Sequence, residues 1–427
     1  MSFLDRVVIT NAKTVSNTST MLKLGAGETW PGELALSVRP DIASYFSNQL
    51  TNGVILVAGT NGKTTTTLML KKILESNGDR VVTNATGANL LNGIVSSFIK
   101  SADWKGDLHA DAGVFEVDEN SLPIVLKHII PKRIVILNLF RDQLDRYGEV
   151  DIIIEKWQKV LRNLPRETEV VLNSDDPSIA YLGKLISGKV TYFGLNDTKK
   201  YLKEKEHATD STFCPNCGER LHYKGVYYSH IGIWECRKCG TKRPDPNVHT
   251  FPQVLSGLYN QYNTLAAVAC AKTLGIADRD ISSALENFEP AFGRQETLGF
   301  HGKTVQLFLS KNPTGFNASL RTVKSMGAKH VFLLLNDRIP DGRDVSWIWD
   351  VDFEMLKAST VYVSGDRVYD LGLRLAYADV SPIVEPDVHA GLSKAVQAMP
   401  KEQTLYVLAT YSAMLDVRKI LTGKKIL

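Results

Sequence analysis

Short runs of consecutive apolar residues alternate with longer segments of helical periodicity over most of the chain. Runs such as VILVA at 54–58, AGVFEV at 112–117 and EVVLN at 169–173 have the length of buried strands. The segments between most of these runs, such as KTTTTLMLKKILESNG at 63–78, have the apolar spacing of helices. Strands that are apolar on both faces and separated by helices are typical of a mostly parallel sheet with helices on both sides. The pattern therefore predicts an α/β fold.

The alternation breaks near residue 198, and a second series of strand-like runs begins near residue 304. Runs such as HVFLLL and TLYVLAT in this second series again have the length of buried strands. Between the two series lie a charged segment with four cysteines and the stretch NFEPAFGRQET at 287–297, which we expect to be a hinge. The sequence thus predicts a short helical lead-in at 1–50, a central domain at 51–290 with an insertion at about 205–245, and a C-terminal α/β domain at 291–427.

Composition narrows the class of protein. The 427 residues are 44% hydrophobic and 22% charged, as in an ordinary globular protein, and the formal net charge is only +4. Such a charge gives no broad basic field, which argues against a dedicated nucleic-acid-binding protein. No apolar run approaches the ~18 residues of a membrane span, and the N-terminal residues lack the features of a signal peptide. We therefore expect a cytoplasmic protein without a transmembrane segment, which leaves peripheral contact with a membrane open.

The most informative stretch is GTNGKTT at 59–65, which follows a predicted strand and precedes a predicted helix. Glycines at such a turn let backbone N–H groups close around phosphate oxygens, and the helix N-terminus adds partial positive charge. We expect Lys63 to reach the β- and γ-phosphates of ATP and the hydroxyl of Thr64 to bind Mg²⁺. The general P-loop pattern would have glycine in place of Val57, so only the compact core of the motif is present. The residues expected to bind the nucleotide here are Gly59, Thr60, Asn61, Gly62, Lys63, Thr64 and Thr65.

This core resembles the phosphate loop of the Mur ligase superfamily, which includes the peptidoglycan amino-acid ligases and the folylpolyglutamate synthases. The resemblance extends over roughly residues 50–427. It implies a P-loop ATPase central domain of the Mur ligase type, followed by a Rossmann-like α/β C-terminal domain. It also implies a reaction in which ATP activates a carboxylate as an acyl phosphate, which an amine then attacks.

Three further stretches are similar to segments of the family that carry known roles. They are FEVDEN, whose glutamate would hold a second Mg²⁺, GLYNQYNTLAA, which would hold adenine, and FGRQE, whose arginine would approach the ribose and phosphates. The resemblance implies these roles for Glu116, for Asn260 and Asn263, and for Arg294, respectively. The stretch NLFRDQLDRYG departs from the family pattern, because Gln143 stands in the place of a histidine. An amide is a poor metal ligand, so no metal role is expected for this glutamine.

Two departures from the family pattern restrict which members of the family this chain resembles. The amino-acid ligases begin with a nucleotide-sugar-binding domain, whereas the phosphate-loop strand of this chain begins near residue 54. We therefore expect no such domain and no UDP-linked sugar substrate. In addition, the stretch FLSKNP has Lys311 in the place of the family's histidine, at a point where the usual ligases position the incoming amino acid.

The segment DGRDVSW at 341–347 is similar to one branch of the family, the ligase subunits of lipid II isoglutaminyl synthases. The resemblance implies ATP-dependent amidation of the α-carboxylate of D-glutamate in the lipid II stem peptide. It implies as partner a GatD-like glutamine amidotransferase with a Cys and a His, whose triad an aspartate of this segment completes. It assigns this role to Asp344, and it implies a heterodimer that works on lipid II at the inner membrane face.

The spacing Cys-x₂-Cys-x₁₈-Cys-x₂-Cys is a strong zinc signal in a reducing compartment. Four thiolates fill a tetrahedral shell, so we expect a structural zinc ion in an inserted ribbon. His222 and His230 lie between the two pairs, and we expect them to be surface or strand residues rather than ligands. The segment between the pairs alternates like a hairpin with exposed aromatic residues, which could stack on bases, pack on the parent domain or guide a substrate. The expected zinc ligands are Cys214, Cys217, Cys236 and Cys239.

Three functions remain open at this point. The favoured one is the amidating ligase. The second is another ATP-dependent amide ligase of the superfamily, such as a folylpolyglutamate-type enzyme, against which the cysteine-rich insertion and the DGRDVSW segment argue. The third is a nucleic-acid-binding ATPase that uses the zinc ribbon, against which the nearly neutral charge argues.

Overall fold

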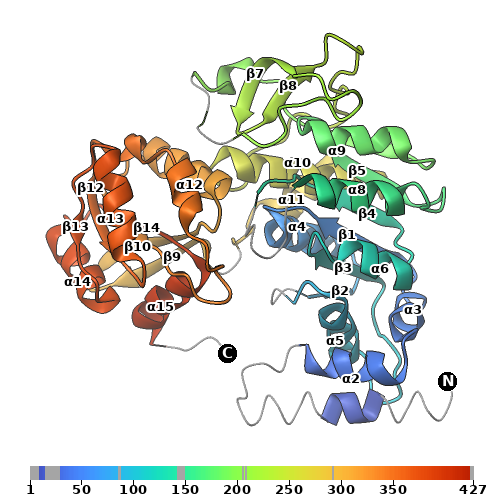
Figure 1. Cartoon of the computed structure of the whole chain (residues 1–427). Coiled ribbons are helices and arrows are strands. Elements are labelled where there is room, and N and C mark those ends of the chain that lie inside the picture. Colours follow the sequence, from blue (N-terminus) through green and yellow to red (C-terminus); the bar gives the residue numbers. More distant parts are fainter. Residues whose placement is uncertain are drawn as a thin grey trace.

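Two six-stranded sheets and one two-stranded ribbon form the framework of the molecule in the computed structural model (Figure 1). Both large sheets are mostly parallel, so the predicted α/β class is confirmed. Within the part of the chain that is described, none of the helices combines the length and the apolar character that crossing a membrane requires. The structure describes residues 9–14, 29–84, 88–141, 150–203, 206, 209–290 and 293–423.

The first sheet has the strand order β2-β3-β1-β4-β5-β6, and all its strands are parallel. Strands β1 and β3 are buried along their whole length, which explains their unbroken apolar character. Because β1 lies between β3 and β4, the loops that follow these three strands meet at one edge of the sheet. The strands are β1 (Gly53–Ala58), β2 (Val81–Thr83), β3 (Ala112–Val117), β4 (Arg133–Ile136), β5 (Glu169–Asn173) and β6 (Val190–Phe193).

Helices cover both faces of the first sheet and enclose two apolar cores. One core lies under α4 (Lys63–Ser76), α10 (Leu258–Thr273) and α11 (Asp278–Leu285). The lead-in also joins a core, because Ile42 and Phe46 are fully buried under the opposite face. The helices on that opposite face are α2 (Trp30–Val38), α3 (Ile42–Ser47), α5 (Leu91–Ser101), α6 (Leu122–His128), α8 (Val150–Leu161) and α9 (Pro177–Leu182).

The second sheet has the order β13-β12-β11-β14-β10-β9, with only β9 antiparallel to its neighbour. Its strands are β9 (Arg294–Phe300), β10 (Lys303–Leu309), β11 (His330–Leu334), β12 (Thr360–Ser364), β13 (Ile383–Val384) and β14 (Thr404–Ala409). One face packs on α12 (Pro313–Ser325), α13 (Val368–Tyr377) and the 3₁₀ turns η3 (Ser346–Asp350) and η4 (Phe353–Leu356), and the other packs on α14 (Val388–Ala398) and α15 (Tyr411–Thr422). In Figure 1 this second unit, in orange and red, lies beside the first.

The expected hinge at 287–297 is wrong over its last residues. Residues 294–297 begin strand β9, in which Arg294 pairs with Phe308 and Thr297 with Gln306 of β10. This strand lies at an edge of the sheet and Gln295 is its single buried residue, so its sequence RQETLGF is too polar to resemble the buried strands. Residues 291 and 292 lie outside the described part of the chain.

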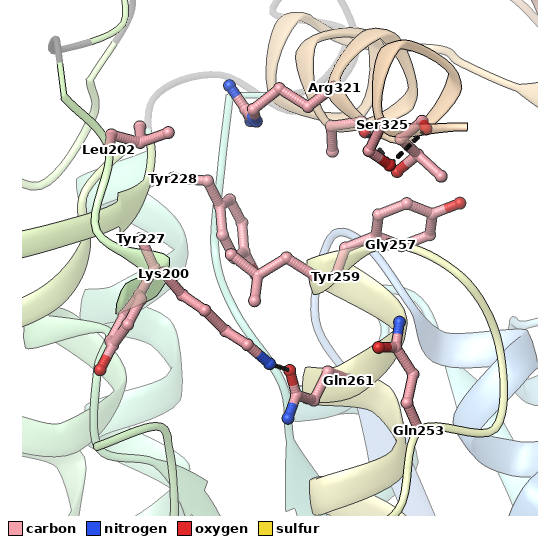
Figure 2. A pocket seen from close by; sticks show the side chains of 13 residues that line it. Lys200, Leu202, Tyr227, Tyr228, Gln253, Gly257, Tyr259, Gln261, Arg321 and Ser325 are labelled. Atoms are coloured by element: carbon pink, nitrogen blue, oxygen red, sulfur yellow. Dashed lines mark hydrogen bonds between the residues drawn. The ribbon is translucent and has the colours of Figure 1, made fainter. Parts of the chain in front are cut away.

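The two-stranded ribbon is an antiparallel hairpin of β7 (His222–Tyr228) and β8 (Ile231–Glu235), at the top of Figure 1. Its buried residues Tyr227, Tyr228 and Ile231 join the core that α4 and α10 share. The expectation of exposed aromatic residues is therefore wrong for both tyrosines and for Trp234, which is also buried. These side chains pack on the parent unit, and Tyr227 and Tyr228 also line a pocket between the ribbon, α10 and α12 (Figure 2).

Candidate active site

The phosphate loop connects β1 to α4 and depends on glycine at two positions. Gly62 has a φ of +93°, and a Cβ atom there would lie 2.0 Å from Oδ1 of Asn263. Gly59 has a φ of +134°, and its Cβ atom would lie 2.9 Å from the carbonyl oxygen of Asn138. Val57, which breaks the general motif, is a buried strand residue opposite Glu116 and lies before the turn. The compact core of the motif is thus sufficient to form the turn.

Asn138, at the end of β4, holds the phosphate loop in shape. Its side-chain oxygen accepts a hydrogen bond from the N–H of Asn61 (2.9 Å), and its side-chain nitrogen donates one to the carbonyl of Asn61 (3.0 Å). Its own carbonyl accepts a hydrogen bond from the N–H of Thr60 (3.0 Å). The sequence analysis did not assign this role, because the two segments are distant in sequence and meet only through the strand order. Gln143, in the same motif, lies outside the described residues.

Lys63 is buried at the start of α4, where its Nζ atom has three oxygen partners. It donates hydrogen bonds to the carbonyl oxygens of Gly59 (2.5 Å) and Thr60 (3.2 Å), and it lies 3.1 Å from a carboxylate oxygen of Glu119. Burial alone would raise the pKa of Glu119, but the positive charges of Lys63 and Lys311 outweigh it and lower that pKa. The sequence analysis missed Glu119. The available signal was a second acid in FEVDEN, directly after a buried strand.

Thr64 of α4 and Glu116 of β3, both predicted to hold Mg²⁺, lie side by side. The Thr64 hydroxyl donates a hydrogen bond to a carboxylate oxygen of Glu116 at 2.5 Å. Glu116 is itself fixed by Asn84, which accepts from its N–H (3.0 Å) and donates to its carbonyl (2.9 Å). A hydroxyl and a carboxylate are the oxygen ligands that Mg²⁺ prefers, so this pair fits the ion. Thr65, the last residue of the predicted loop, is buried in the first turn of α4.

The residues predicted to contact adenine and ribose lie close to this loop. Asn263 donates a hydrogen bond to the side-chain oxygen of Asn260 (3.1 Å) and packs against Gly62. Asn260 donates to the carbonyl of Ser256 (2.8 Å) in the segment before α10. Burial lowers the pKa of Arg294, the first residue of β9, and the charge of Glu116 opposes this effect.

The second unit reaches the phosphate loop through the N-terminus of α12. Asn312 caps this helix by accepting a hydrogen bond from the N–H of Gly315 (2.8 Å). Its side chain also contacts that of Asn61, with N···O distances of 3.1 Å and 3.4 Å. The segment with the unusual Lys311 therefore joins the phosphate site, although it lies about 250 residues further along the chain.

Asp344 lies on a different part of the second unit, in the exposed loop between β11 and η3. Its carboxylate accepts a hydrogen bond from the N–H of Ser346 (2.8 Å), and this bond lowers its pKa. Asp341, in the same loop, is buried and accepts a hydrogen bond from the N–H of Ser412 (2.9 Å) at the start of α15. Asp341 thus anchors the loop, and Asp344 is presented at the surface.

The four cysteines of the predicted zinc site converge at the base of the ribbon. Their sulfur atoms all lie within 4.8 Å of one another, with Cys214–Cys239 at 3.7 Å and Cys217–Cys236 at 3.6 Å. Two ligands of a tetrahedral zinc ion with Zn–S bonds of about 2.3 Å lie roughly 3.8 Å apart, so the cluster fits this metal.

Two acids that follow β5 hold the ribbon on the first unit, and neither role was predicted from the sequence. Asp175 lies 2.6 Å from Nε of Arg243, which follows the ribbon, and accepts a hydrogen bond from the Tyr262 hydroxyl of α10 at 2.5 Å. Asp176 lies 3.3 Å from Nε2 of His230, which is buried rather than exposed. The expectation that His230 is a surface or strand residue is thus corrected, because it lies in the buried turn between β7 and β8.

Comparison with known proteins agrees with this arrangement. Residues 57–271 match the Mur ligase middle domain, and residues 309–414 match the MurT ligase C-terminal family. Subunit MurT of the glutamine-hydrolysing lipid II isoglutaminyl synthase from Staphylococcus aureus is 34% identical over 87% of this chain and 88% of its own length. The protein of the same name from Streptococcus pneumoniae is 33% identical over 95% of this chain and 94% of its own.

Among solved structures, a pseudomurein peptide ligase type C from Methanothermus fervidus is similar in fold, with a TM-score of 0.67. It covers 90% of this chain and 80% of its own, at 23% identity. The fold and the phosphate site thus define a ligase of the Mur type, a class for which ATP and Mg²⁺ are the expected ligands. Within that class, the chain belongs to the MurT family, the ligase subunits of lipid II isoglutaminyl synthases.

Proposed function

We propose that this chain uses ATP to amidate the D-glutamate α-carboxylate of lipid II, with ammonia that a glutamine amidotransferase subunit supplies. The observation that carries the proposal is the convergence of Lys63, Thr64 and Glu116 on one phosphate-binding turn in a chain of the MurT family. The printed name of the relatives gives the reaction and the glutamine hydrolysis. The alternative is another amide ligase of the superfamily. The matches to the MurT ligase C-terminal family and to the two MurT proteins do not support this alternative.

The residues of the phosphate site suggest how the first step proceeds. Lys63 and the N–H groups of the loop would bind the β- and γ-phosphates, while Asn260, Asn263 and Arg294 would place the adenine and ribose. Thr64 and Glu116 would hold Mg²⁺, which neutralises phosphate charge when it is bound. A carboxylate oxygen of D-glutamate then attacks the γ-phosphorus, and ADP leaves. Because little of the chemistry is covalent to the protein, these residues act mainly by positioning and charge.

The second step needs a source of ammonia outside this chain. Four of the five cysteines converge in the ribbon, and the fifth, Cys270, is buried in α10, where burial raises its pKa to about 12. A thiol in that state is a poor nucleophile, and a zinc ion bound by the other four cysteines would leave this chain no thiol for glutamine hydrolysis. Ammonia from the partner would attack the acyl carbon, release phosphate and lose a proton to give the amide.

The second unit offers a surface on which such a partner could dock beside Asp344. Helix α13 exposes the apolar or aromatic residues Tyr369, Leu373 and Tyr377, which are 72%, 55% and 72% exposed. Trp349 of η3 lies against Tyr377, with ring centroids 5.3 Å apart, and η3 begins two residues after Asp344. We propose that this face binds the amidotransferase as a heterodimer and that Asp344 orients the catalytic histidine of the partner.

Three further assignments concern the zinc ion, the location of the protein in the cell and nucleic acids. The four cysteines would bind one structural zinc ion, because a closed shell of four thiolates leaves no open position for substrate. The substrate is a lipid, so the protein would act in the cytoplasm at the inner face of the membrane. The structure offers no support for nucleic-acid binding by the ribbon, because Tyr227 and Tyr228 are buried against the first unit.

Two variants test the proposal with purified heterodimer, lipid II, ATP and either glutamine or ammonia. Lys63→Ala should abolish amidation from both nitrogen sources, whereas Lys72→Ala, an exposed lysine of the same helix, should leave it unchanged. Asp344→Asn should abolish only the glutamine-driven reaction, and Asp379→Asn, an exposed aspartate of the same unit, should have no effect. Full glutamine-driven activity in Asp344→Asn would refute the triad role, and amidation by Lys63→Ala would refute the ATP site.

A further inference from the structure

The loop that presents Asp344 is fixed by a buried aspartate three residues earlier, to which the proposed mechanism gives no role. Asp341 is 3% exposed, and both of its carboxylate oxygens accept hydrogen bonds from Ser412, the second residue of α15. The backbone N–H of Ser412 lies 2.9 Å from one oxygen, and its hydroxyl donates to the other. The N–H of Asp341 donates to the carbonyl of Arg338 (2.8 Å), so the backbone of this residue is held as well as its side chain.

The support behind this contact belongs to the core of the C-terminal unit. Asn336, which follows β11, is 1% exposed and donates a hydrogen bond to the hydroxyl of Ser412 (3.0 Å). Its side-chain oxygen accepts a second hydrogen bond from the N–H of Asp366 (2.9 Å). Helix α15 packs on the second sheet through the buried residues Met414 and Val417. A displacement of Ser412 would therefore disturb both the buried asparagine and the packing of the helix.

The chain is also held on the other side of Asp344. Val345 is 9% exposed and Ile348 is 2% exposed, and both belong to the apolar core under α12 and α13. The carboxylate of Asp344 itself accepts the hydrogen bond from the N–H of Ser346 at 2.8 Å. This exposed acid thus lies between two buried anchors, Asp341 and Val345. A side chain that is held in this way loses little freedom when a partner binds it.

The exact place of such an acid matters for a catalytic triad. The acid selects the tautomer of the histidine and orients its ring, and a displacement of about 1 Å can lower the rate about 100-fold. Asp341 cannot serve as that acid itself, because it is buried and Ser412 donates to both of its carboxylate oxygens. Its contacts instead determine where the exposed part of the loop lies.

We propose that Asp341, held by Ser412, is a positioning residue for glutamine hydrolysis, because it sets the place from which Asp344 meets the histidine of the partner. This role of Asp341 rests on the proposed triad role of Asp344. It involves no contact of Asp341 with glutamine, ATP or lipid II.

The test compares glutamine-driven and ammonia-driven amidation by the purified heterodimer, with lipid II and ATP. Asp341→Ala removes both bonds to Ser412, so the glutamine-driven kcat should fall about 100-fold. The KM for glutamine and the ammonia-driven rate should each change less than about twofold, because the partner binds glutamine and the phosphate site is intact. Asp341→Asn keeps an acceptor for the N–H of Ser412, so its glutamine-driven kcat should stay within about tenfold of the unchanged protein.

Asp387→Ala is the matched control for the loss of a carboxylate that holds a helix. Asp387 caps α14 of the same unit by accepting a hydrogen bond from the N–H of Ala390 (2.7 Å), and its removal should change neither reaction. Ser412→Ala is a milder test that leaves Asp341 and the backbone bond in place. It should lower the glutamine-driven kcat about fivefold and leave the ammonia-driven rate unchanged.

The possible failures can be told apart. An unchanged glutamine-driven kcat in Asp341→Ala would overturn the positioning role. Loss of the heterodimer in this variant, or an equal loss of both reactions, would also overturn it, because Asp341 would then only stabilise the fold. Full glutamine-driven activity in Asp344→Asn would refute the triad role, and the positioning role would fall with it. Loss of that activity in Asp344→Asn but not in Asp341→Ala would refute the positioning role alone.

Discussion

The phosphate loop and the cysteine ribbon are both tight turns, but they are held in place by different means. Three asparagines from separate segments surround the loop, namely Asn138, Asn263 and Asn312. The ribbon site has only a small apolar cluster around it, which consists of Ala180, Cys214, Leu221, Trp234 and Cys236. A cluster of that size contributes little core, so we expect a metal ion to fix the shape of the cysteine site, whereas the loop is ordered by protein contacts.

The largest expected effect is a steric block of the phosphate loop. In Gly62→Ala the new Cβ atom would lie 2.0 Å from Asn263, so the turn must shift and nucleotide affinity should fall by about 100-fold or more. Gly78→Ala is a matched control, because Gly78 also has a positive φ, +98°, but has open space around its Cβ position. Calorimetric titration with ADP and Mg²⁺ measures the nucleotide affinity of both variants. An equal loss of affinity in both would show that strain at a positive φ, and not the contact with Asn263, causes the effect.

The next effect concerns the ribbon. Cys236→Ser should remove the bound zinc and increase hydrogen exchange in the ribbon, because three thiolates no longer complete the shell. Nucleotide affinity should fall by less than about threefold, since the loop does not depend on the metal. Cys270→Ala, which changes the cysteine outside the ribbon, should keep the zinc content. A loss of nucleotide binding as large as that of Gly62→Ala would show that the two regions are not independent.

The difference between the phosphate loop and the ribbon also explains which features could be predicted from the sequence. The turn, the four cysteines and the Thr64–Glu116 pair follow from motifs in which spacing along the chain determines function. Asn138, Glu119 and the acids that follow β5 act through partners that only the strand order brings near, so the local patterns around these residues do not indicate their contacts. Strand β9 was missed for a related reason, because a mostly unburied strand at a sheet edge can be as polar as a loop.

A smaller effect, which depends on pH, tests how the ribbon is anchored. Burial lowers the pKa of His230, but Asp176 and the nearby acids Asp210 and Glu206 outweigh it, so the pKa is raised. A raised pKa in the folded state gives stability that is fully present below the unfolded value of about 6.5 and lost as the pH rises through the folded value.

His230→Gln should therefore lower the free energy of unfolding by about 2 kcal/mol at pH 6 and by less toward alkaline pH. Urea denaturation at a series of pH values measures the difference from the unchanged protein. His222→Gln, on the half-exposed side of the ribbon, should change it by less than about 0.5 kcal/mol at any pH. A constant difference between pH 6 and pH 9 would mean that His230 carries no charge in the fold.

In the proposed reaction, the phosphate site activates a carboxylate by transferring a phosphoryl group to it. Lipid II with oxygen-18 in both oxygens of the D-glutamate α-carboxylate tests this claim directly, with the intact heterodimer, ATP and ammonia. We expect each phosphate released to carry one labelled oxygen and the amide product to keep the other. Amide formation with entirely unlabelled phosphate would contradict it.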